Sequence, residues 1–200
     1  MTTTRTAERS RAQIIEAATK EFAEHGLAGA RVDRIARRAR VNKQLLYHHY
    51  GDKQQLFREV LHRMVVETSA LLASTSSEPG DLVALLAAAA SDEEQQWLRL
   101  LQWEALETGA EPLLLEDERA EEMAGFVALV ADGQAHRVLP DDVDAGQLAL
   151  ALIALGTFPY LLPQFSRLIT GEAPGTPAFS TAHQAFVGAL TGHLARRSGP

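Results

Sequence analysis

Apolar residues recur along most of the chain at the three-to-four-residue spacing of an amphipathic helix. Ile14, Ala18 and Phe22 form the first such stripe, which ends at His25-Gly26. Four such apolar stripes precede the first long loop, and they predict helices over residues 14–25, 32–39, 42–50 and about 53–71. No strand-like alternation bounded by hairpin turns occurs, so the pattern predicts an all-α protein.

A loop is predicted over Ser74–Gly80, because this segment contains only loop-forming residues and one glutamate. The second half of the helical pattern begins after it. Five further apolar runs predict helices near 81–90, 93–108, 112–133, 145–169 and 180–196, or about nine helices in all. Pro159 and Pro163 should bend or interrupt the fourth of these runs. We expect two domains, a head over 1–53 and a larger helical body over 54–200.

The net charge changes sign at nearly the same place in the chain. Residues 1–63 contain 13 basic and 7 acidic residues, a net charge of +6, and residues 64–200 have a net charge of −13. This asymmetry indicates that the head meets a polyanion while the body repels it, although a solvated basic face is the alternative. The absence of cysteine, of a signal-peptide segment and of an 18-residue apolar run predicts a soluble protein of the cytoplasm, without a membrane segment.

Two short helices joined by a tight connection, at 32–39 and 42–50, form the pattern of a helix-turn-helix motif over about 32–51. The second helix of such a pair lies in the major groove of DNA, with its first residues at the base edges. Asn42 is expected to cap this helix. Lys43 then suits guanine or phosphate, Gln44 suits adenine, and Leu45 suits a thymine methyl group.

The following residues are typical of phosphate contacts, because a hydroxyl or an imidazole N–H can donate to a phosphate oxygen. Tyr47, His48 and His49 are assigned this role, whereas Tyr50 is interpreted as a packing residue with a polar tip. Asp52 resembles the start of a capping box and places Lys53 in the first turn of the next helix. The N-terminus of a helix favours an anion, so a DNA phosphate is expected near Lys53.

The stretch from Ile14 to Phe57, and above all Leu-Tyr-His-His-Tyr-Gly-Asp-Lys, closely resembles the N-terminal region of TetR-type repressors. The resemblance implies a homodimer whose two recognition helices read a palindromic operator. It also implies a C-terminal domain whose ligand separates those helices.

The chain departs from the family pattern at several positions. Arg31 stands near the place of a capping Thr or Ser, and Arg40 stands in the turn at the place of a glycine, where a Cβ atom is disfavoured if φ is positive. These departures concern the operator sequence and leave the motif intact. The expected DNA contacts are Arg31, Arg40, Asn42, Lys43, Gln44, Leu45, Tyr47, His48, His49 and Lys53.

In the body, residues 145–158 are apolar on nearly all sides, which requires burial on most faces. Together with 180–196 they are predicted to form a four-helix bundle between two subunits, with an ordinary core inside one chain as the alternative. A small apolar ligand is expected near Trp103, Phe126, Tyr160 and Phe165.

Two other classes of protein compete with a ligand-sensing repressor. An enzyme is disfavoured, because the single Glu-x-x-His, Glu59 to His62, lacks the second copy that a di-iron bundle needs, and no common catalytic motif occurs. No catalytic residue, metal site or cofactor is therefore expected. A DNA-binding regulator without a small-molecule ligand fits the sequence as well as a ligand sensor does.

Overall fold

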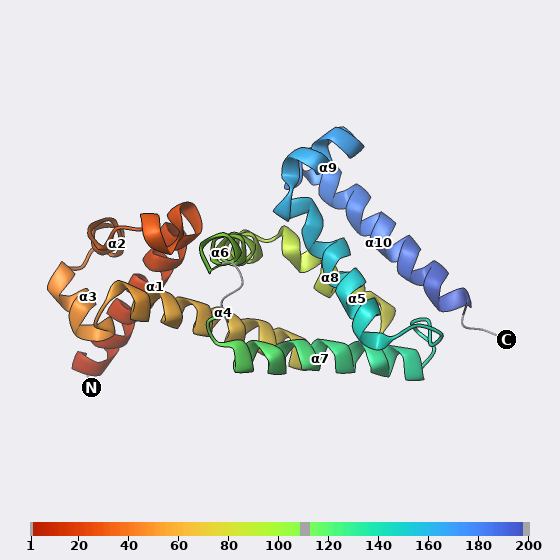
Figure 1. Cartoon of the computed structure of the whole chain (residues 1–200), viewed down its shortest axis with the longest axis horizontal. Coiled ribbons are helices and arrows are strands. Elements are labelled where there is room, and N and C mark those ends of the chain that lie inside the picture. The colour runs from red at the N-terminus through yellow and green to blue at the C-terminus, as the bar shows by residue number, and fades with distance from the viewer. Residues whose placement is uncertain (1, 109–112, 198–200) are drawn as a thin grey trace. The chain divides into compact units, whose positions relative to one another are not determined.

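The computed structural model describes residues 2–108 and 113–197, and every regular element within them is a helix (Figure 1). The α-helices are α1 (Thr2–Gly29), α2 (Val32–Ala39), α3 (Lys43–Tyr50), α4 (Lys53–Ser74), α5 (Pro79–Ala87), α6 (Asp92–Thr108), α7 (Glu116–Ala135), α8 (Ala145–Leu161), α9 (Pro163–Thr170) and α10 (Pro177–Arg197), and a 3-10 turn, η1 (Ala88–Ala90), follows α5. The prediction of an all-α protein is confirmed.

The helices of the predicted motif agree with their predicted bounds. α2 covers 32–39 as expected, and α3 begins one residue after Asn42 because Asn42 is its N-cap. α1 is longer than predicted and contains a non-helical residue, Gly26, with φ 66° and ψ 178°. Pro112, the predicted first residue of the seventh helix, lies outside the described residues, and α7 begins at Glu116.

The predicted helix over 145–169 is two helices, α8 and α9, whose axes differ by 93°. The break lies at Leu162 (φ −127°, ψ 65°), and Pro163 is the first residue of α9, where its missing N–H costs nothing. Pro159 stays inside α8, and its carbonyl accepts a hydrogen bond from Ser166 Oγ at 3.3 Å. This break makes ten α-helices in the described residues instead of about nine. Within the described residues, no single helix is long and apolar enough to cross a membrane. Only α8 and α9 taken together reach that length and apolar character, and a sharp bend separates them.

Contacts divide the chain into two compact units, of which the first comprises residues 1–67 and 99–118. Its core is built from α1, α2, α3 and the first half of α4, with Phe22, Leu46 and Leu56 fully buried. Phe22 and Phe57 meet edge to face, with ring centroids 4.9 Å apart. This core fixes α2 and α3 against α1 and therefore positions the predicted motif.

The second unit comprises residues 68–98 and 119–200. Its core is contributed by α5, α7, α8, α10 and the segment after α7, and its buried members are Leu82, Leu86, Phe126, Val130, Leu139, Ala149, Leu152 and Val187. α8 approaches α5 closely at Gly156, where a Cβ atom would lie 3.0 Å from the Leu86 carbonyl oxygen. The two units interleave along the chain, so residues 99–118 belong to the first unit although the sequence places them in the predicted body.

Candidate nucleic-acid interface

The start of α2 is held by a buried carboxylate of α1. Glu21 is 1% exposed and accepts hydrogen bonds from the backbone N–H of Arg31 at 2.9 Å and from Arg34 Nε at 2.6 Å. Burial raises the pKa of Glu21, but the hydrogen bonds from Arg31 and Arg34 and the charge of Arg34 outweigh it, so the net shift is downward. Arg31 makes no side-chain cap, and Glu21 satisfies its N–H instead.

The turn that follows α2 is a Schellman-type helix end. The N–H of Val41 bonds to the Ala36 carbonyl at 3.0 Å, and the N–H of Arg40 bonds to the Arg37 carbonyl at 3.2 Å. Arg40 has φ 57° and ψ 37°, the left-handed conformation that the sequence suggested for a residue at this place. The fold therefore holds the backbone of Arg40 in a strained conformation.

The start of α3 is capped as predicted, since the Asn42 side chain accepts a hydrogen bond from the Leu45 N–H at 2.7 Å. Leu46 is fully buried and anchors α3 to the core of the first unit. Because one face of α3 points inward at Leu46, the other face presents Gln44 and Tyr47 to solvent. This is the arrangement of a recognition helix, whose exposed first turns reach the base edges of the major groove.

Lys43 is held at the opening of α3. Its Nζ lies 2.9 Å from Asp33 Oδ1 of α2 and 5.9 Å from the centre of the Tyr47 ring. The hydrogen bond to Asp33 and the charge of that carboxylate raise the pKa of Lys43, so its ammonium is favoured. Asp33 therefore orients the lysine that the sequence assigned to guanine or phosphate.

The end of α3 contacts the N-terminal part of α1. Arg11 Nε donates to His49 Nδ1 at 3.5 Å, and the Tyr50 hydroxyl donates to the Arg11 carbonyl at 3.3 Å. Burial, then the charges of Arg11 and His48, lower the pKa of His49 and favour its neutral form. Tyr50 has the packing role predicted for it, whereas Tyr47 is 41% exposed.

Lys53 has partners that the sequence did not reveal. Its Nζ donates to the carbonyls of Ala28 and Ala30, at 3.3 and 3.2 Å. Asp52 Oδ1 accepts from the Gln55 N–H at 2.8 Å and caps α4 as predicted, which places Lys53 at the first position of the helix. The lysine thus fastens α4 to the end of α1, and its contact with a DNA phosphate stays a prediction.

The predicted DNA-contacting residues lie on the segment from the end of α1 to the start of α4. Seven of them are exposed, namely Arg31, Arg40, Asn42, Lys43, Gln44, Tyr47 and His48, whereas Leu45, His49 and Lys53 are half-buried. Sequence reasoning missed the partners that hold them, namely Glu21, Asp33 and Arg11. Only Asp33 carried a signal, as an acidic residue in the first turn of a helix.

The residues predicted to contact a ligand are distributed over both units. In the first unit, Trp103 donates its indole N–H to the Ala23 carbonyl of α1 at 3.2 Å. In the second unit, Phe126 is a core residue, Tyr160 is half-buried, and Phe165 of α9 is exposed. Their contact with a ligand stays a prediction.

The second unit contains a pocket of about 460 Å³ at another place, lined by Thr75, Ser76, Ser77, Glu78, Leu129, Asp132, His136 and Val138. The described part of the chain also brings donor atoms of Glu21, Glu24 and His25 within 4.8 Å of one another. Arg34 already binds Glu21, and Arg38 binds both oxygens of Glu24 at 3.2 Å. These carboxylates are neutralised by guanidinium groups, so the cluster is a poor metal site.

Comparison with known proteins agrees with this geometry. Residues 14–60 match the family model for bacterial regulatory proteins of the tetR family, and residues 80–189 match the model for the tetracyclin repressor-like C-terminal domain. The HTH-type transcriptional repressor SCO4008 of Streptomyces coelicolor is 42% identical over 82% of this chain and 85% of its own length. The repressor NicS of Pseudomonas putida is 26% identical over 76% of each chain.

Among solved structures, the transcriptional regulator SCO4942 of Streptomyces coelicolor superposes with a TM-score of 0.70 and 27% identity over 92% of this chain and 97% of its own. GusR of Salmonella enterica shares the fold, with a TM-score of 0.64 at 20% identity over 92% and 95% of the chains. The molecule is therefore a helix-turn-helix transcriptional regulator of the repressor class and not an enzyme. It belongs to the TetR family, whose members bind operator DNA and act as dimers.

Proposed function

We propose that this protein, as a homodimer, represses transcription by placing α3 of each protomer in the major groove of a palindromic operator, and that a small apolar ligand releases it. The single observation that carries the proposal is the construction of α3. Its inner face is anchored by Leu46 and its first turn is capped by Asn42, so Gln44 and Tyr47 project from a fixed helix. Operator DNA lies in the bacterial cytoplasm, and we place the protein there.

The dimer is proposed to form through α8 and α10, as the apolar pattern of 145–158 and 180–196 suggested. α8 faces its own core through Ala149 and Leu152, yet it leaves Leu150 62% exposed. On α10, Val187 is buried while Phe186 is 53% exposed. Exposed large apolar side chains beside a complete core support an interface with a second copy.

Ligand release is proposed to act through the second unit, with Phe126, Tyr160 and Phe165 as contacts. Burial raises the pKa of Tyr160, partly offset by a hydrogen bond with Ser180, so its hydroxyl is protonated at neutral pH. A half-buried tyrosine whose ring meets Phe179, with centroids 6.3 Å apart, suits an apolar molecule with one polar group. The link to DNA is proposed to run through α6, where Trp103 holds the end of α1.

The DNA proposal is tested by separating base contacts from phosphate contacts. Gln44→Ala should relax sequence preference at one position of each half-site, at a cost of roughly 1–3 kcal/mol. Lys53→Ala should weaken all duplexes similarly and reduce the salt slope by about one per protomer. Arg167→Ala removes an exposed cation from the second unit and serves as the control. A wild-type protein that selects no sequence from random duplex DNA would refute the proposal.

The ligand proposal is tested with the two tryptophans, Trp97 and Trp103, as reporters. A compound that alters their fluorescence should also lower operator affinity, because it can release DNA only by preferring the non-binding arrangement. A coupling of about 1–3 kcal/mol corresponds to a 5–150-fold change in affinity. Compounds that bind tightly and leave operator affinity unchanged would favour a regulator without a small-molecule effector.

A further inference from the structure

The turn between α2 and α3 has an arginine where the backbone favours glycine. At φ 57° and ψ 37°, Arg40 adopts the left-handed conformation. A Cβ atom there lies close to the following carbonyl oxygen and costs free energy, so glycine is the usual residue at this position of a helix end. Strain of this kind concentrates at functional sites. The strained position of Arg40 therefore points to a role for its guanidinium group.

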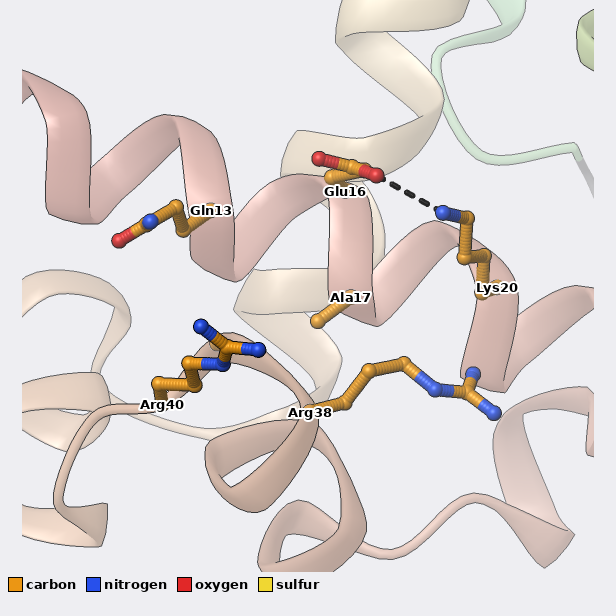
Figure 2. A pocket seen from close by; sticks show the side chains of 7 residues that line it. Gln13, Glu16, Ala17, Lys20, Arg38 and Arg40 are labelled. Carbon is orange, nitrogen blue, oxygen red and sulfur yellow. Dashed lines mark hydrogen bonds and ion pairs between the residues drawn. The ribbon is translucent and has the colours of Figure 1, made fainter.

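That guanidinium borders a pocket of about 270 Å³ between α1 and the turn, which we call the α1–turn pocket. Its lining residues are Gln13, Glu16, Ala17 and Lys20 of α1, and Arg38, Ala39 and Arg40 at the end of α2. Figure 2 shows the Arg40 side chain rising from the turn towards α1, on the side of Gln13 and Ala17, while Arg38 extends along α1 towards Lys20. Two helices and a turn thus converge on one polar hollow.

The charges around the α1–turn pocket leave one cation uncompensated. Lys20 Nζ lies 2.7 Å from Glu16 Oε1, and this hydrogen bond and the lysine charge lower the pKa of Glu16. Arg38 is paired with Glu24 at 3.2 Å. The exposed Arg40 side chain forms no hydrogen bond or ion pair within the described residues. The pocket therefore has a surplus of one positive charge, carried by the group with most N–H donors.

A planar guanidinium at the mouth of a polar pocket, with an amide from Gln13 nearby, suits an oxyanion such as phosphate. Its position indicates the source of the phosphate. Only Val41 and the cap Asn42 separate Arg40 from Lys43, the first residue of the recognition helix. The major groove that receives this helix is walled by backbone phosphates, which are the nearest anions to the preceding turn.

We infer that the α1–turn pocket binds a backbone phosphate of the operator and that Arg40 is the residue that holds it. The inference rests on the proposed binding of α3 in the major groove. One phosphate would then touch both α1 and the turn, and it would fix the angle at which α3 enters the groove. The strained backbone conformation of Arg40 is tolerated because it places a guanidinium group at this pocket.

The test is Arg40→Gly, because this variant moves stability and affinity in opposite directions. Glycine relieves the backbone strain, so the thermal midpoint should rise. Loss of the phosphate contact should lower affinity for operator and for random duplex alike, by about fivefold per protomer at 0.15 M salt, and the salt slope should fall by about one per protomer. Loss of folding cannot mimic this combination, and Arg40→Lys should restore most of the salt slope.

The chain contains a matched control in Arg137, which is exposed, lies in the second unit and also has a positive φ, 58°. Arg137→Gly removes the same charge and the same kind of strain. It should raise the thermal midpoint and leave DNA affinity and the salt slope unchanged.

An Arg40→Gly protein that binds operator with wild-type affinity and salt slope would overturn the inference, while wild-type operator binding would still support the proposed function. Failure of the wild type to bind any operator would refute the proposed function itself. A third arm titrates inorganic phosphate without DNA. Micromolar phosphate that stabilises the wild type but not Arg40→Gly, with unchanged DNA affinity, would assign the pocket to a free anion and overturn the inference as well.

Discussion

Replacement of Glu122 by glutamine should make the protein more stable at pH 8 and should have little effect at pH 4.5. Glu122 lies on α7 and is 6% exposed. Burial raises its pKa from the ordinary 4.5 to about 7; the charge of Arg119, one turn earlier on α7, opposes the rise, and Glu94 of α6 adds to it. Glutamine keeps the shape of the side chain and removes the charge.

The direction of the pH effect follows from proton linkage. Between about pH 4.5 and 7 the folded chain keeps a proton on Glu122 that the unfolded chain has lost. The free energy of unfolding of the wild type therefore decreases as pH rises through this window and levels off above it. One pKa unit corresponds to about 1.4 kcal/mol, so the full loss is about 3 kcal/mol. The free energy of unfolding of Glu122→Gln should not decrease in this way, because glutamine does not ionise.

The assay is urea unfolding at pH 4.5 and pH 8 and at fixed protein concentration, because dimerisation also contributes to stability. The variant should exceed the wild type by up to about 3 kcal/mol at pH 8 and match it at pH 4.5. Glu121→Gln, at an exposed position one residue earlier, is the control and should change little at either pH. A difference between Glu122→Gln and wild type that is equal at the two pH values would refute the reasoning.

Three further substitutions probe the first unit, each measured by its unfolding midpoint in urea. Asn42→Ala should cost about 1 kcal/mol by removing the cap of α3, and Asn42→Ser should restore most of it; equal midpoints for alanine and wild type would contradict the capping role. Leu46→Ala should cost about 2–5 kcal/mol, since the side chain is fully buried, and a loss below 1 kcal/mol would show that α3 is anchored elsewhere. Gly26→Ala should lower the free energy of unfolding by about 1–3 kcal/mol, because φ is 66° and the new Cβ atom would lie 2.9 Å from the Trp103 ring. An unchanged midpoint would show that the backbone of α1 at Gly26 adjusts to a side chain without loss of stability.

Local signals were sufficient for most of the helices and for the helix ends around the motif. The bounds of α2, the cap at Asn42 and the cap at Asp52 were all predicted correctly. These features depend on residues one to four positions apart, where periodicity and side-chain capping act without the rest of the fold. The break between α8 and α9 was predicted only as a bend or an interruption, because a proline permits either until neighbouring helices are placed.

The partners of the site residues were decided by the tertiary structure alone. Glu21 meets Arg34 across 13 positions, Lys53 meets the Ala28 carbonyl across 25, and Trp103 meets Ala23 across 80. No spacing rule in a single sequence links residues so far apart, because their meeting depends on how whole helices pack. The sequence therefore determined which helices form and which face of α3 is exposed. The packing of α1 against α2, α4 and α6 decided which charges are already paired, and it left Arg40 with a free guanidinium among the described residues.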